Sequence, residues 1–87
     1  MNGNIEKEVK EMLSRMTGFE PEEIGLDMEF VKDLGIDSLK VIEIATAIEK
    51  TYKVTVADRH VMQLKTVKEA VKLIQELLDK KNRKRKK

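Results

Sequence analysis

The side chains able to do chemistry in this sequence are few, and they exclude most kinds of catalytic centre. There is no cysteine and only one histidine, so thiolate chemistry, disulfides and a histidine-based metal centre are excluded. His60 and a serine distant from it in sequence are a weak basis for a catalytic triad, because no orienting group is evident. We therefore expect a protein that is not an enzyme and has no metal site of its own.

One hydroxyl differs from the others in its position. Ser38 follows a glycine-bearing loop and begins a predicted helix, in the sequence LGIDSL at residues 34–39. A phosphate attached there would face the positive end of the helix dipole and unpaired backbone N–H groups. Asp33 and Asp37 flank it and could hold Mg²⁺ while a phosphoryl donor is present. The alternative is that Ser38 or Asp37 is simply the N-cap; if Asp37 caps, the Ser38 hydroxyl stays free and exposed.

The elements that position Ser38 are predicted to be helices. Apolar residues recur at helical spacing in residues 4–16, with Asn4 as the expected N-cap, and in residues 38–52. The apolar face of the second segment is broader than a surface helix needs, so this helix is expected to lie centrally. Residues 18–37 form a long connection, which apolar side chains of its own can pack: Phe19, Ile24, Leu26, Phe30 and Leu34.

Two further helices are expected in the second half of the chain. Residues 58–63 predict one short helical turn, with Asp58 as its cap. The last helix begins at a capping box formed by Thr66 and Glu69. The predicted fold is therefore an all-α four-helix bundle with a long first loop and a short third helix.

The net charge of +2 conceals two parts of opposite charge. Residues 80–87 hold seven Lys or Arg and no acid, which leaves residues 1–79 with a net charge of −5. We predict a helical domain over 1–79 and a basic, disordered tail over 80–87. No apolar stretch is long enough for a membrane span, and the N-terminus has no apolar run typical of a secretory signal. A cytoplasmic monomer without stable membrane insertion is expected.

The LGIDSL sequence at a loop–helix junction, followed by Val41, Ile42 and Glu43, resembles the acyl carrier protein family. The resemblance covers residues from about 4 to 79. It implies that Ser38 receives a covalent 4′-phosphopantetheine arm from coenzyme A through a separate phosphopantetheinyl transferase that uses Mg²⁺. Asp37, Asp33 and Leu39 are expected beside this site. The arm ends in a thiol, which carries acyl groups as thioesters for fatty acid or related specialised biosynthesis.

The resemblance also implies a partner surface and a sheltered interior. The helix that begins at Ser38 faces acyl-loading and acyl-processing enzymes, and the residues expected near that surface are Lys40, Val41, Glu43 and Ile44. Lys40 carries a positive charge where the family usually has an acidic or neutral residue. A specialised carrier for a dedicated pathway is therefore at least as much favoured as a general role in fatty acid synthesis. The candidates for an interior that shelters an acyl chain are Ile42, Ala45, Ile48, Val61, Met62, Ala70 and Ile74.

The basic tail supports a rival interpretation. A small helical interaction protein could bind an anionic partner, nucleic acid or lipid, through this arm. Nucleic acid is the less favoured of the two, because Trp is absent and Tyr and Phe total three residues. A carrier acquires a covalent phosphopantetheine, whereas a basic-arm binder does not and loses affinity steeply with salt.

Overall fold

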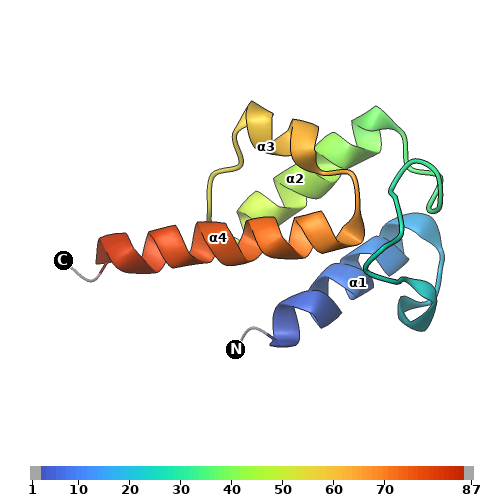
Figure 1. Ribbon diagram of the computed structural model, residues 1–87, viewed down its shortest axis with the longest axis horizontal. Helices are drawn as coiled ribbons and strands as arrows, with labels where there is room; N and C mark the ends of the chain where they lie inside the picture. The colour runs from blue at the N-terminus through green and yellow to red at the C-terminus, as the bar shows by residue number, and fades with distance from the viewer. Residues whose placement is uncertain (1–2, 86–87) are drawn as a thin grey trace.

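The structure, a computed structural model, describes residues 3–85 and, for side chains, residues 5–82. Its helices are α1 (Gly3–Thr17), α2 (Ser38–Tyr52), α3 (Asp58–Gln63) and α4 (Val67–Arg85), with a 3₁₀ turn, η1 (Pro21–Glu23), in the first loop. Both α1 and α2 pack on α4, and α3 packs on α2 (Figure 1). The predicted all-α four-helix bundle, with its long first loop and short third helix, is confirmed.

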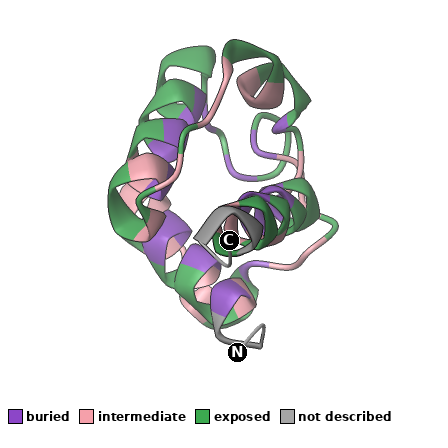
Figure 2. Ribbon diagram, turned by 90° about the vertical axis from the view of Figure 1, so that its left-hand side faces the viewer, coloured by how far each residue is buried: buried purple, intermediate pink, exposed green. Residues whose placement is uncertain are grey.

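One apolar core joins the four helices and the first loop. Buried residues face the interior from each of the long helices and from the loop (Figure 2). Each fully buried aliphatic or aromatic side chain stabilises the fold by about 1.5–3 kcal/mol. The largest of these side chains are Phe30, Leu13, Ile24, Ile44, Ile48, Ile74, Val9 and Val67. Since α2 contributes at its centre, the core fixes the direction of that helix and the position of its first residue.

The long first loop is held against the beginning of α4 by backbone hydrogen bonds. The backbone N–H groups of Val67 and Lys68 donate to the carbonyls of Met28 and Leu26, at 3.1 and 2.9 Å. A helix leaves its first N–H groups without intrahelical partners, and the loop carbonyls satisfy two of them. The packing predicted for the loop's own side chains is confirmed: Ile24, Phe30 and Leu34 are buried, and Phe19 and Leu26 partly so.

Two predicted helix caps are wrong. α1 begins at Gly3, so Asn4 is a helical residue and not the cap. α3 begins at Asp58, and its N-cap is Ala57. The side chain of His60, the third residue of α3, reaches back to the cap residue, because its Nδ1 accepts a hydrogen bond of 3.1 Å from the backbone N–H of Ala57. The only histidine therefore has a structural role at the start of a short helix.

The last helix begins as predicted and ends later than its apolar pattern. The Glu69 N–H donates to Thr66 Oγ1 at 3.2 Å, and the Thr66 N–H donates to Glu69 Oε1 at 3.0 Å, which confirms the capping box. The helix then continues past Leu78 through Arg85, so the tail predicted to be disordered is helical over residues 80–85, while residues 86–87 lie outside the described part of the chain. Lys and Arg are good helix formers, and the dipole favours cations near a helix C-terminus.

The described part of the chain contains no helix that is both long and apolar enough to cross a bilayer.

Candidate functional site

Ser38 is the first residue of α2, and its neighbour Asp37 caps that helix. Asp37 has extended backbone angles (φ −87°, ψ 178°), and its Oδ1 accepts a hydrogen bond of 3.0 Å from the Lys40 N–H. This confirms the sequence interpretation in which Asp37 is the cap. Because the cap is already in place, the exposed hydroxyl of Ser38 is not needed to hold the end of the helix.

The turn before Ser38 is held in place by Asp33 and a glycine. Asp33 Oδ2 accepts a hydrogen bond of 2.7 Å from the Glu29 N–H, which closes the turn. Gly35 then adopts a positive φ of 67°, a conformation that residues with a Cβ rarely adopt. On either side of it, Leu34 and Ile36 are buried. The junction is thus anchored in the core, while Asp33, Asp37 and Ser38 remain exposed.

An apolar pocket opens beside Ser38. It has a volume of about 290 Å³ and lies between the first loop, the beginning of α2, and α3. Its lining residues are Val31, Ser38, Val41, Ile42, Val61, Met62 and Leu64. The site therefore combines an exposed hydroxyl at the N-terminus of α2 with an adjacent hydrophobic pocket.

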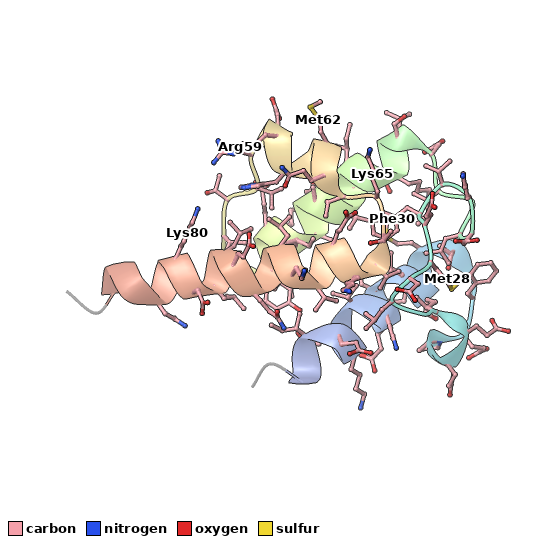
Figure 3. All side chains as sticks on the ribbon, viewed as in Figure 1. Met28, Phe30, Arg59, Met62, Lys65 and Lys80 are labelled. Carbon is pink, nitrogen blue, oxygen red and sulfur yellow. The ribbon has the colours of Figure 1, made fainter. Side chains whose placement is uncertain are left out.

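The predicted acyl-chain interior is only partly interior. Ala45, Ile48, Ala70 and Ile74 are buried, and Val61 is partly buried against the core. Ile42 and Met62 are exposed, at 50% and 76% of their surfaces, so their assignment to the interior is wrong. Figure 3 shows the Met62 side chain projecting outward from α3. Both residues border the mouth of the pocket beside Ser38.

The predicted partner surface needs the opposite correction. Lys40 and Glu43 are exposed as expected, and their side chains form an ion pair at 4.0 Å. Val41 and Ile44 are buried, with 8% and 1% of their surfaces exposed, so they do not belong to a surface. The core side of α2 consists of residues at helical spacing from Val41, namely Val41, Ile44, Ala45 and Ile48. Leu39 lies on the outer side of the helix, with 71% of its surface exposed.

The far end of α2 contains a contact that the sequence did not indicate. The Tyr52 hydroxyl donates a short hydrogen bond to the carboxylate of Glu8 on α1. The Tyr52 carbonyl accepts a hydrogen bond of 3.2 Å from the Lys81 Nζ on α4. Burial, together with the hydrogen bond and charge of Glu8, raises the pKa of Tyr52 well above its usual value. This junction ties three helices together at the end of α2 opposite Ser38.

Within the described residues, no group of three or more His, Cys, Asp or Glu side chains is arranged to hold a metal ion.

Comparison with known proteins places this site in a family. Residues 7–74 match the family model described as "Phosphopantetheine attachment site". An acyl carrier protein from Rhodococcus erythropolis is 43% identical over 70 residues, which cover 80% of this chain and 77% of that protein. This chain belongs to the acyl carrier protein family. Like the family, it carries acyl groups on a covalently attached 4′-phosphopantetheine arm for fatty acid or specialised biosynthesis, and it interacts with biosynthetic enzymes.

Two further proteins are similar to this chain, one in sequence and one in fold. The meromycolate extension acyl carrier protein of Mycobacterium tuberculosis is 42% identical over 69 residues, covering 79% of this chain and 60% of that protein. The crystal structure of an acyl carrier protein from Thermotoga maritima superposes with a TM-score of 0.78 at 20% identity. That superposition covers 91% of this acyl carrier protein and 92% of the other chain, so the bundle is the same fold.

Proposed function

We propose that Ser38 is the residue to which the 4′-phosphopantetheine arm is attached, through a phosphodiester on its hydroxyl. One observation carries this assignment: Ser38 lies exposed at the first position of α2 while Asp37 makes the capping hydrogen bond. An anionic phosphodiester there lies at the positive end of the dipole of a 15-residue helix. When bound, the arm supplies the thiol for thioester formation, which this cysteine-free chain lacks.

Asp33 and Asp37 support the attachment reaction. Each carboxylate holds a backbone N–H through one oxygen, Oδ2 of Asp33 and Oδ1 of Asp37, and so has a fixed place beside Ser38. The second oxygen of each exposed carboxylate is suited to Mg²⁺, a hard cation that prefers oxygen ligands. A phosphopantetheinyl transferase that brings coenzyme A and Mg²⁺ to this junction is the first partner of the chain.

The pocket beside Ser38 is the place where an acyl chain on the arm would first leave water. Its volume of about 290 Å³ and its apolar lining from Val31, Ile42, Val61 and Met62 suit a hydrocarbon chain. Each methylene removed from water contributes about 0.8 kcal/mol. The deeper residues Ala45, Ile48, Ala70 and Ile74 already fill the core, so a longer chain must separate side chains to reach them.

The exposed side of α2 meets the enzymes that load and process the cargo. This side consists of Leu39, Lys40, Ile42 and Glu43, with Met62 of α3 adjacent through the pocket mouth. Lys40 and Glu43 form an ion pair, so the charge near the arm is mixed. A mixed surface favours partners other than those that approach a purely acidic helix, and we therefore favour a dedicated pathway. The chain itself is a carrier and performs no catalytic step.

The attachment site is tested by incubating three forms of the carrier, wild type, Ser38→Ala and Thr46→Ala, with a phosphopantetheinyl transferase, coenzyme A and Mg²⁺. The mass of each form is then measured. Wild type is expected to gain the mass of one arm, and Ser38→Ala to gain none. Thr46→Ala is the matched control, because Thr46 is an exposed hydroxyl on the same helix whose Oγ1 donates to the Ile42 carbonyl at 3.1 Å. Thr46→Ala should be modified like wild type. Modification of Ser38→Ala would refute the assignment.

A further inference from the structure

We propose that the basic C-terminal segment of this carrier, residues 80–87, docks the protein on an anionic lipid surface. The segment has seven Lys or Arg among eight residues and no acid, whereas residues 1–79 carry a net charge of −5. Charge is thus segregated along the chain into a negative bundle and a positive end. Basic residues near an anionic membrane each strengthen the association by about fivefold, so seven among eight residues give a strong attraction.

The described part of this segment is a helical extension of the bundle. α4 continues without interruption through Arg85, and its C-terminal turns project beyond the other helices (Figure 1). The Lys81 Nζ donates to the Tyr52 carbonyl at 3.2 Å, so the extension is fastened to the end of α2 where it leaves the bundle. Because the helix is continuous through Arg85, its last turns point away from the acidic bundle, and the Lys80 side chain is exposed.

The extension and Ser38 lie at opposite ends of α2. Tyr52, the residue bound by Lys81, is the last residue of α2, and Ser38 is the first. At 1.5 Å per residue, this 15-residue helix separates the two by about 20 Å. A lipid surface at the extension leaves the arm and the outer side of α2 open to enzymes. This inference rests on the proposed attachment of the arm to Ser38, because that attachment places the acyl group at the beginning of α2.

The pattern of residues favours a lipid surface over an inserted helix or a nucleic acid. Residues 79–87 include no apolar residue, so the extension has no apolar face that could enter the bilayer, and its contact is electrostatic. It contains no aromatic residue on which a base could stack. The projecting helix also holds the negative bundle away from a negative surface, which reduces their repulsion.

The test is co-sedimentation of the full-length carrier with vesicles of phosphatidylcholine alone or mixed with phosphatidylglycerol. We expect binding only to the mixed vesicles, with affinity falling steeply between about 50 and 200 mM salt. Lys80→Glu with Lys84→Glu should lower the partition coefficient more than tenfold. The control pair Lys7→Glu with Lys68→Glu makes the same charge change at exposed positions on the bundle and should lower it less than twofold. Lys80 lies on the projecting part of α4 (Figure 3).

Ser38→Ala separates this inference from the attachment site. It should bind the mixed vesicles as wild type does, whether or not transferase modification is lost. The inference is overturned by no binding to phosphatidylglycerol vesicles at low salt, or by equal losses in the two charge-reversal pairs. It is also overturned if a DNA duplex at the same salt binds the carrier more tightly than the mixed vesicles do, since the extension would then serve a nucleic acid.

Discussion

The carboxylate of Asp37 accepts a hydrogen bond of 3.0 Å from the backbone N–H of Lys40, so Asp37, and not its neighbour Ser38, caps α2. Asp37 stabilises the beginning of α2, and the exposed Ser38 hydroxyl is left to chemistry. A serine that was itself the cap would lose that hydrogen bond on modification. With the proposed attachment at Ser38, the capping hydrogen bond and the attached group involve different residues.

This division predicts different consequences for substitutions at the two positions. Asp37→Ala removes the cap and should lower the free energy of unfolding by about 1 kcal/mol, a fall in Tm of about 4–8 °C. Asp37→Asn keeps a capping oxygen and should stay close to wild type. Ser38→Ala should leave Tm nearly unchanged. Thermal unfolding followed by circular dichroism measures all three; a larger loss for Ser38→Ala than for Asp37→Ala would contradict the division.

The start of α2 was predictable from sequence because its determinants are local. Asp37, Ser38 and the glycine-bearing turn lie within a few residues of one another, and caps depend on such short-range chemistry. The same was true of the capping box at Thr66 and Glu69. The caps at Asn4 and Asp58 failed because α1 begins two residues and α3 one residue earlier than those caps require, and side-chain type alone does not fix such a boundary.

The division of α2 into buried and exposed residues was not predictable. Its apolar residues extend around so much of the helix that sequence cannot tell which strip faces α4. Packing selects Val41 and Ile44 for the core, and leaves Leu39 and Ile42 outside. The end of α4 was also missed, because the prediction followed the apolar pattern, whereas Lys and Arg continue a helix without it.

The Lys81 contact predicts how much of the basic segment the bundle needs. A chain ending at Asp79 loses the hydrogen bond from the Lys81 Nζ to the Tyr52 carbonyl, and should lose about 0.5–1.5 kcal/mol of stability. A chain ending at Asn82 keeps that bond and should unfold like the full-length protein. Urea denaturation of the three chains measures the differences. Equal stability of the two truncated chains would show that the contact contributes nothing.

Tyr52 predicts a spectroscopic titration. It is the only tyrosine and there is no tryptophan, so phenolate absorbance reports this residue alone. Burial and the Glu8 carboxylate raise its pKa, so the folded protein should titrate well above the ordinary value of about 10. The associated stability is complete below pH about 10 and is lost as pH rises through the folded-state pKa.

Glu8→Gln is the matched variant for this titration. It removes the charge but keeps an oxygen that accepts the Tyr52 hydroxyl, so the midpoint should fall and still remain above the ordinary value because burial persists. Absorbance is followed together with circular dichroism to restrict the readings to folded protein. A wild-type midpoint at the ordinary value, or one that Glu8→Gln does not move, would contradict the contact.

Lys40 predicts a change of partner preference. Lys40→Glu removes the positive charge beside Glu43 and makes the outer side of α2 acidic near Ser38. Partners that approach with Lys or Arg should then load the carrier faster at low salt, by a modest factor, because an exposed charge contributes about 0.2–1 kcal/mol. The measurement is kcat/KM of a malonyl-loading enzyme of fatty acid synthesis across a salt series.

The control for partner preference is Lys50→Glu, an exposed lysine in the last turn of the same helix. It makes the same charge change far from Ser38 and should alter kcat/KM much less. A dedicated partner that presents an acid opposite Lys40 should show the reverse, with slower use of Lys40→Glu. Equal rates for wild type and Lys40→Glu at low salt would place Lys40 outside the recognised surface.

The central claim, that acyl groups are carried on an arm at Ser38, is tested most directly by peptide mass mapping of the modified protein. Trypsin cleaves after Lys32 and Lys40 and releases residues 33–40, DLGIDSLK, in which Ser38 is the only hydroxyl-bearing side chain. We predict that this peptide carries the mass of one phosphopantetheine, and of the acyl group when the carrier is loaded. An unmodified 33–40 peptide from a protein that bears the arm elsewhere would contradict the account.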